Sequence, residues 1–193
     1  MDELKLIAIT GGIGSGKSTA LKIIADAGNK TFSSDAIVSE LYQNIEVRKK
    51  LKTLFPEAVS GENYDIDRKK ISAAVFNDKV KHTALTELIT PMVIAEIFRR
   101  SSSLSGKVFV EVPLLFECEY DDMFDGVIVV TRPKSERIKS VITRSNLTEQ
   151  EVLSRMNNQF DYDGADLSPY VVIENVGNVT DLTKKLLSAI EKI

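Results

Sequence analysis

Cysteine and histidine are almost missing from this sequence of 193 residues, which has one of each, Cys118 and His82. A single cysteine excludes an intrachain disulfide framework and a zinc site built from several cysteines. No apolar run approaches the roughly 20 residues that a membrane-spanning helix needs. The first ten residues, MDELKLIAIT, carry acidic side chains and lack the charge pattern of a signal peptide. We therefore expect a cytoplasmic protein that does not associate with membranes.

An excess of positive charge is also missing. Lys and Arg number 25 against 28 Asp and Glu, which gives a net charge of −3, and the sequence pI is about 5.4. Nucleic acid is therefore not expected as a partner. The sequence has neither internal repeats nor a long low-complexity tract, and 43% of its residues are hydrophobic. This composition is typical of a globular protein with one substantial core. We expect a monomer or a small homo-oligomer, although composition does not determine the oligomeric state.

The most informative stretch of the chain is Gly11–Ser18, GGIGSGKS, which matches G-x-x-x-x-G-K-[ST] and follows the apolar run Leu6–Ile9. A glycine-rich turn from strand to helix points backbone N–H groups into one concavity, and the helix dipole strengthens their attraction for phosphate. Lys17 is expected to reach the β- and γ-phosphates of a nucleotide, and the Ser18 hydroxyl to ligate Mg²⁺. The predicted nucleotide-binding residues are Gly12, Ile13, Gly14, Ser15, Gly16, Lys17, Ser18 and Thr19. Kinases, GTPases and motor ATPases share the motif, so it does not identify the reaction.

Short apolar runs rich in β-branched residues alternate with amphipathic helical segments. The runs are continuous, which favours strands buried on both faces of a parallel sheet. The predicted strands are Leu6–Ile9, Thr31–Phe32, Val108–Val112, Val127–Val130 and Val171–Ile173, and the predicted helices are Lys17–Ala27, Lys134–Arg144, Glu149–Gln159 and Asp181–Ile193. Gly28 is expected to end the first helix, and Thr148 to cap the third in a capping box with Glu151. The pattern predicts a three-layer α/β domain.

The interval from residue 36 to residue 106 breaks this alternation, because its apolar positions recur at helical spacing and no strand is evident. We interpret it as a helical insertion, with Gly61–Asp65 as a polar turn, between core segments 1–35 and 107–193. An insertion at this point follows the carboxyl end of a strand, where ligands of open α/β sheets bind. It is the natural place to bind a group that accepts phosphate.

Two carboxylates are candidates for the chemistry. Asp35 follows the second predicted strand, so it is expected at the same sheet edge as the glycine-rich loop, where it could accept a hydroxyl proton. It could equally cap a helix over Ala36–Tyr42. Glu111 lies at the carboxyl end of the third strand, a position suited to Mg²⁺, although a solvated strand end is the alternative.

Arginines could hold the negative charge of a transferred phosphoryl group. Arg137 and Arg144 are two helical turns apart and lie on one predicted helix face, and Arg155 lies in the next helix. The insertion contributes Arg68, Arg99 and Arg100, which could meet phosphates of an acceptor. Solvated surface charge is the alternative interpretation of each arginine.

Together these residues resemble the dephospho-CoA kinase family over nearly the whole chain. The matching segments are ITGGIGSGKST at Ile9–Thr19, Asp35, the pair Asp67-Arg68, VPLLFE at Val112–Glu117, Thr143-Arg144, the R-x-x-x-Q segment Arg155–Gln159 and the segment Ile173–Gly177. The family's Asp-Ala-Asp after strand two is Ser33-Ser34-Asp35 here, and its His-Pro pair is Thr90-Pro91. His82, upstream on a predicted helix, is interpreted as a surface residue.

The resemblance implies a P-loop fold with a five-stranded parallel sheet, a helical acceptor-binding insertion and a helical lid over about residues 138–160. It also implies ATP-dependent phosphorylation, with Mg²⁺, of the ribose 3′-hydroxyl of dephospho-CoA. Asp35 then corresponds to the general base and acceptor contact, Lys17 and Arg144 to catalytic residues, and Ser18 and Glu111 to the metal-binding pair. Arg68 and Glu117 correspond to further acceptor contacts.

Three other functions fit parts of the sequence. The nearest is another small-molecule P-loop kinase, acting on a nucleoside or nucleoside monophosphate. A regulatory GTPase would need D-x-x-G and N-K-x-D motifs, but Asp161–Gly164 lies far from any predicted strand end and Asn29–Phe32 lacks the aspartate. A non-catalytic nucleotide-binding scaffold is disfavoured because Lys17, Ser18, Asp35 and Arg144 occur together.

Overall fold

Five parallel strands form the central sheet of the computed structural model, which describes residues 3–145 and 147–193. The strand order is β2-β5-β1-β6-β7, and every pairing is parallel. The strands are β1 (Lys5–Thr10), β2 (Lys30–Ser33), β5 (Lys107–Glu111), β6 (Gly126–Thr131) and β7 (Val171–Glu174). All five lie where the continuous β-branched runs predicted them, and the α/β fold class is confirmed.

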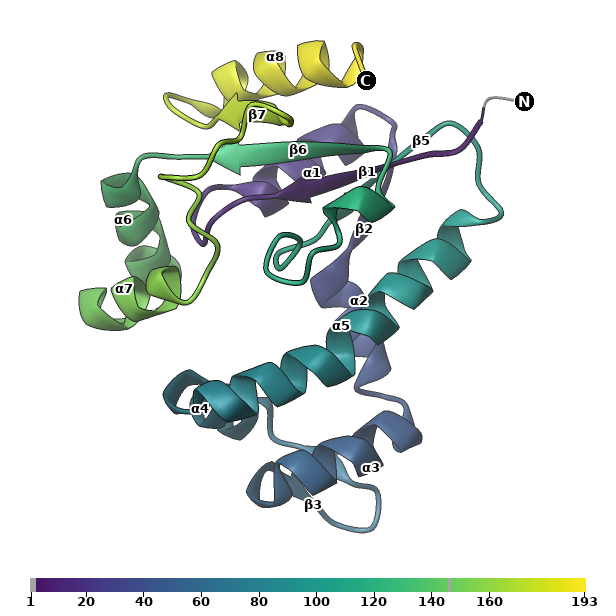
Figure 1. The fold of residues 1–193 in the computed structure, drawn as a ribbon, viewed down its shortest axis with the longest axis vertical. Coiled ribbons are helices and arrows are strands. Elements are labelled where there is room, and N and C mark those ends of the chain that lie inside the picture. Colours follow the sequence, from purple (N-terminus) through teal and green to yellow (C-terminus); the bar gives the residue numbers. More distant parts are fainter. Residues whose placement is uncertain (1–2, 146) are drawn as a thin grey trace. The chain divides into compact units, whose positions relative to one another are not determined.

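Two helices pack on one face of this sheet and close the main core (Figure 1). They are α1 (Lys17–Asp26) and α8 (Val179–Ile190). Ala20 and Ile24 of α1 and Leu182 and Leu186 of α8 are at most 1% exposed, and they pack against side chains of β1, β5, β6 and β7. Burial of these aliphatic side chains, each worth about 1.5–3 kcal/mol when fully buried, holds the helix that follows the glycine-rich loop against the sheet.

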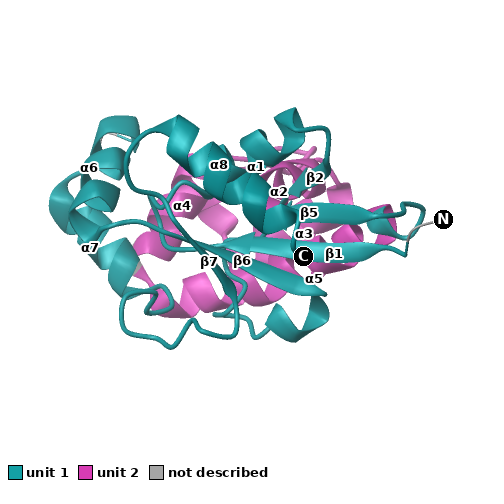
Figure 2. Cartoon of the chain, turned by 90° about the horizontal axis from the view of Figure 1, so that it is seen from above, with its two compact units in different colours: residues 1–33, 101–193 teal, residues 34–100 magenta. Residues whose placement is uncertain are grey.

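The chain divides into two compact units, which Figure 2 shows in different colours. Unit 1 comprises residues 1–33 and 101–193, and unit 2 comprises residues 34–100. Unit 1 also contains η2 (Asp121–Met123), α6 (Lys134–Ser145) and α7 (Glu149–Asn157). The capping box before α7 is present, because Thr148 Oγ1 accepts from Glu151 N and the Glu151 carboxylate accepts from Thr148 N.

Unit 2 is built mainly of helices. They are α2 (Ser34–Leu41), α3 (Ile45–Leu54), the short η1 (Pro56–Ala58), α4 (Arg68–Asn77) and α5 (Lys79–Ser101), which runs one residue beyond the unit. Pro91 lies inside α5, and Asp67 caps α4 by accepting from Lys69 N and Lys70 N.

The prediction that the insertion has no strand is wrong. β3 (Val59–Ser60) and β4 (Asp65–Ile66) pair antiparallel around the turn at Gly61, whose φ is +74°. Strands of two residues are too short to show a period-2 pattern, so sequence periodicity could not reveal them. The predicted turn at Gly61–Asp65 is confirmed as the connection of this hairpin.

Candidate active site

The phosphate loop, Gly11–Ser18, runs from the end of β1 into the first turn of α1. Gly16 is the N-cap of α1 with φ 104° and ψ 21°, and it has no side chain to cap the helix. The first turn of α1 also contains no acidic residue. The backbone N–H groups and the positive end of the helix dipole are therefore left for an anion from solution.

Close packing explains why two loop positions are glycine. A Cβ atom on Gly12 would lie 2.4 Å from Arg137 Nη1, and one on Gly16 would lie 2.3 Å from Asn175 Nδ2. Both distances are shorter than side-chain contacts allow, so a larger residue would push these side chains away. Polar side chains from α6 and from the segment after β7 thus lie directly against the loop backbone.

Three hydrogen bonds hold the loop and the strand before it. Ile13 N donates to Gln159 Oε1 over 2.7 Å, and Asn175 Nδ2 donates to the Ser15 carbonyl over 2.7 Å. The hydroxyls of Thr10 and Tyr162 lie 3.0 Å apart. Sequence reasoning matched Gln159 to a motif without a role and did not single out Asn175 or Tyr162. The position of Asn175 directly after β7, at the carboxyl edge of the sheet, was the available signal.

The structure brings the two predicted metal ligands together. Ser18 Oγ donates to Glu111 Oε1 over 2.9 Å, and Glu111 is 5% exposed at the end of β5. The alternative interpretation of Glu111 as a solvated strand end is therefore wrong. Lys17 Nζ donates to the carbonyls of Gly11 and Gly12 over 2.7 and 3.2 Å, so its ammonium group lies over the loop.

The chemistry of this oxygen pair fits Mg²⁺. Mg²⁺ prefers oxygen ligands and binds through one or two protein groups together with substrate phosphates and water. Across residues 3–145 and 147–193, no group of three or more His, Cys, Asp or Glu side chains is arranged to hold a metal ion. The Ser18 hydroxyl and the Glu111 carboxylate, beside a phosphate site, therefore match an ion held by two protein groups together with phosphate and water. They do not match a metal site built from protein ligands alone.

The arginines of α6 and α7 differ in their surroundings. Arg137 is 5% exposed, and its guanidinium forms an ion pair with Asp163. The interpretation of Arg137 as solvated surface charge is therefore wrong. Arg144 lies exposed in the last turn of α6, and Arg155 is half-buried in α7.

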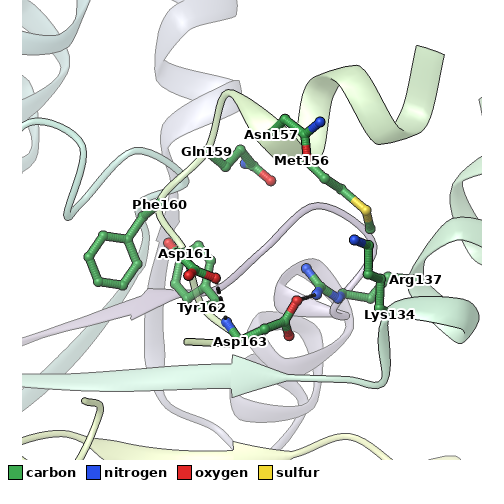
Figure 3. A pocket seen from close by; sticks show the side chains of 9 residues that line it. All are labelled: Lys134, Arg137, Met156, Asn157, Gln159, Phe160, Asp161, Tyr162 and Asp163. Atoms are coloured by element: carbon green, nitrogen blue, oxygen red, sulfur yellow. Dashed lines mark hydrogen bonds and ion pairs between the residues drawn. The ribbon is translucent and has the colours of Figure 1, made fainter. Parts of the chain in front are cut away.

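A cavity of about 380 Å³ lies beside the phosphate loop (Figure 3). Figure 3 shows Lys134 and Arg137 of α6 on one side of the cavity, and Gln159 to Asp163, which follow α7, on the other. Arg137 and Gln159, which line it, also contact the loop at Gly12 and Ile13. The cavity and the loop therefore form one continuous polar region of unit 1.

Glu117 fastens the segment that follows α7. Its Oε1 accepts from Phe160 N over 2.9 Å, and its Oε2 is buried with no hydrogen-bond partner in the described part of the chain. Burial raises the pKa of the Tyr162 hydroxyl, and the negative charge of Glu117 raises it further. Phe116, Phe160, Tyr162 and Tyr170 form a cluster of tilted and edge-on rings around this point.

The remaining predicted site residues belong to unit 2 and are considered within it. Asp35 is exposed in the first turn of α2, which begins at Ser34, so its interpretation as the cap of a helix over Ala36–Tyr42 is wrong. Arg68 Nη1 donates to Ser39 Oγ over 3.1 Å, and its guanidinium stacks over the Tyr42 ring with 5.1 Å to the centroid. Arg99 and Arg100 both pair with Glu96.

The parallel sheet and the phosphate loop define a protein of the P-loop fold class. In keeping with this, the solved structure of a shikimate kinase from Acinetobacter baumannii matches with a TM-score of 0.58. That match covers 98% of this chain and 94% of the other at 16% identity, a likeness of fold alone. The family model for dephospho-CoA kinase matches residues 5–181, and the chain belongs to this family.

Relatives named dephospho-CoA kinase match almost end to end. The relative from Thermus thermophilus is 34% identical over 97% of this chain and 91% of its own length. The relative from Fusobacterium nucleatum is 33% identical over 95% and 96%. A crystal structure of a Thermus thermophilus protein, 34% identical, has a TM-score of 0.83 and covers 100% of this chain and 99% of the other. The family resemblance is confirmed, and the chain is a kinase, a transferase. No helix of the described residues is long and apolar enough to cross a membrane.

Proposed function

We propose that the protein transfers the γ-phosphoryl group of ATP to the ribose 3′-hydroxyl of dephospho-CoA, giving CoA and ADP. Membership of the dephospho-CoA kinase family supports the choice of acceptor. The observation that carries the donor half is the 2.9 Å hydrogen bond between Ser18 and Glu111, directly beside the uncapped start of α1. We further propose that the enzyme works in the cytoplasm, as a monomer or a small homo-oligomer.

On the donor side, the residues from Gly12 to Thr19 bind the phosphates of ATP through the backbone N–H groups that the loop leaves open, and Lys17 neutralises part of the phosphate charge. The N–H groups of Ile13 and Ser15 are already engaged, by Gln159 Oε1 and by the Gly12 carbonyl. Lys17 already lies over the loop, with its ammonium on the carbonyls of Gly11 and Gly12. Ser18 and Glu111 would hold Mg²⁺, Ser18 through its hydroxyl and Glu111 through its carboxylate. When bound, the ion neutralises charge that develops on the phosphate oxygens.

On the acceptor side, Asp35 accepts the proton of the 3′-hydroxyl as the oxygen bonds to the γ-phosphorus and the bond to ADP breaks. Asp35 comes two residues after Ser33, which pairs with Glu111 in the register of β2 and β5. Arg144, on the predicted lid, stabilises the charge of the transferred group. Arg68 and Glu117 contact dephospho-CoA. Glu117 Oε2 is buried and accepts no hydrogen bond within the described residues, so it is available to accept one from the substrate.

The test offers dephospho-CoA, adenosine and AMP separately as acceptors to the purified protein with ATP and Mg²⁺. ADP release is followed by a coupled assay, and the phosphorylated position of the product is mapped by NMR. Of the three acceptors, we expect only dephospho-CoA to be turned over, and we expect its product to carry the new phosphate on the ribose 3′-oxygen. Preference for adenosine or AMP would instead support the nucleoside or nucleotide kinase alternative.

A further inference from the structure

The cavity beside the phosphate loop contains a buried cation with spare hydrogen-bonding capacity. Arg137 is 5% exposed, yet its Nε is buried and has no hydrogen-bond partner in the described part of the chain. Its Nη1 lies against the loop at Gly12, and its Nη2 is paired with Asp163. A buried guanidinium with an unpaired N–H is costly unless a ligand or water completes its hydrogen bonds.

The carboxylate that pairs with Arg137 is not buried in the same way. The side chain of Asp163 is 59% exposed, whereas that of Arg137 is 6% exposed. Asp163 comes from the segment after α7, and Figure 3 shows it reaching the guanidinium from the opposite side of the cavity. An exposed carboxylate can turn to solvent at little cost, but the buried guanidinium still needs an anion.

We propose that this cavity is a subsite for the phosphate chain of the nucleotide, and that Asp163 holds the Arg137 guanidinium until a phosphate oxygen replaces it. The proposal rests on the proposed function only in taking the nucleotide as donor. A planar guanidinium binds phosphate in two parallel hydrogen bonds, which suits it to this exchange. Lys134 lines the same cavity and adds a second positive charge.

Two observations favour phosphate over another anion. The guanidinium lies against Gly12, and Gln159 from the same cavity holds Ile13 N, so the cavity opens onto the loop whose motif binds phosphates. The other carboxylate in the cavity, Asp161, is engaged by its own turn, since its Oδ1 accepts from Asp163 N and Gly164 N. Asp163 is therefore the carboxylate free to exchange.

The first experiment compares Asp163→Asn with Asp166→Asn by isothermal titration calorimetry, using ATP, ADP and inorganic tripolyphosphate without any acceptor. Asp166 is an exposed carboxylate of the same segment that hydrogen-bonds to the backbone N–H and the side chain of Ser168, and none of the ion pairs among the described residues joins it to an arginine. Removing the competing carboxylate should tighten binding of ATP and tripolyphosphate by about two- to tenfold, the size of effect expected for one partly exposed ion pair. Asp166→Asn should leave both affinities unchanged.

Whether Asp163→Asn tightens or weakens the binding of ATP and tripolyphosphate distinguishes the proposed exchange from a purely structural role of the Arg137–Asp163 ion pair. If the ion pair only fastens the segment after α7, Asp163→Asn will weaken binding or leave it unchanged, and either result overturns the proposal. Equal tightening by both aspartate variants would also overturn it, because the effect would then be general electrostatics.

A second experiment combines Asp163→Asn with Arg137→Met. The tightening caused by Asp163→Asn should disappear in the Arg137→Met background, and a tightening that persists there would contradict the exchange. Because Arg137 is buried, each variant is first checked by thermal unfolding. If Arg137→Met does not fold, Arg137→Lys takes its place in the cycle. The comparison of Asp163→Asn with Asp166→Asn still shows whether removing the Asp163 carboxylate tightens or weakens nucleotide binding. These titrations contain no acceptor, so inactivity toward dephospho-CoA would refute the proposed function and leave this result standing.

Discussion

The phosphate loop and the side chains proposed to act on the transferred group are held very differently. Gln159, Asn175 and Arg137, which come from segments distant in sequence, all contact the loop backbone. Asp35 and Arg144 are exposed, and neither side chain forms a hydrogen bond or ion pair within the described part of the chain. The phosphate loop is therefore preorganised by the fold, whereas we expect the exposed groups to gain their partners from substrate.

The sharpest test of this contrast is Asp35→Asn. The exposed carboxylate has no structural contact to lose, so ATP affinity and thermal stability should stay unchanged while kcat falls about 10²–10⁴-fold. Steady-state ADP release and calorimetric ATP binding measure the two quantities. Glu46→Gln removes another exposed carboxylate of unit 2, one that pairs with Lys49, and should keep full turnover. Unchanged turnover in Asp35→Asn would remove Asp35 as the base.

Glu111→Gln probes the preorganised side. It leaves an oxygen for Ser18 but removes the charge proposed to support Mg²⁺, so the rate should fall about 10–100-fold and the Mg²⁺ requirement should rise. Initial rates over a Mg²⁺ titration measure both effects. Glu174→Gln changes a glutamate at the end of β7, which is exposed, and should leave the titration unchanged. The same curve for both variants would contradict the metal role of Glu111.

A smaller effect is expected from Gln159→Ala, which removes one of the hydrogen bonds that hold the loop. ATP should bind about two- to tenfold more weakly, the range for one lost hydrogen bond, while the rate at saturating ATP stays close to that of the parent protein. Asn158→Ala changes the exposed amide next to Gln159, which does not line the cavity, and serves as the control. An unaffected ATP affinity would show that the loop keeps its geometry without Gln159.

The smallest effect concerns unit 2 and its stability. Arg99 and Arg100 hydrogen-bond to Glu96 and lower its pKa to about 2. A carboxylate with a lowered pKa stabilises the folded state at pH values above its ordinary pKa of 4.5, and this stabilisation is lost as the pH falls toward 2. Glu96→Gln should lower Tm by about 1–4 °C at pH 7, and the difference should shrink below about pH 4. Thermal unfolding at several pH values measures it, and a pH-independent difference would point to packing instead.

Local patterns predicted most of the fold. The five core strands, the capping box at Thr148 and the phosphate loop follow from short-range periodicity and side-chain chemistry, and the structure contains them. The Ser18–Glu111 pair was also predictable, because the carboxyl ends of adjacent parallel strands meet at one edge. The hairpin of β3 and β4 was missed because two-residue strands have no readable period.

The sequence patterns also did not predict which charged side chains are buried. Arg137 looked like a surface residue because helix spacing does not reveal what the segment after α7 places against it. Its partner, Asp163, is 26 residues away, and that contact depends on how α6, α7 and the following loop pack. The roles assigned to Asp35, Arg68, Arg144 and Glu117 stay predictions.

The position of β1 in the sheet bears on the order in which the protein is made. β1 lies between β5 and β6, and both neighbours come after residue 106. During synthesis, β1 therefore cannot pair with its neighbouring strands until the second half of the chain has been made. Gln159 and Asn175, which hydrogen-bond to the phosphate loop, are synthesised later still. The helices of unit 2 have mostly local contacts and can form while the ribosome is still working. Nucleotide binding by a nascent chain would then report that nearly the whole protein has emerged.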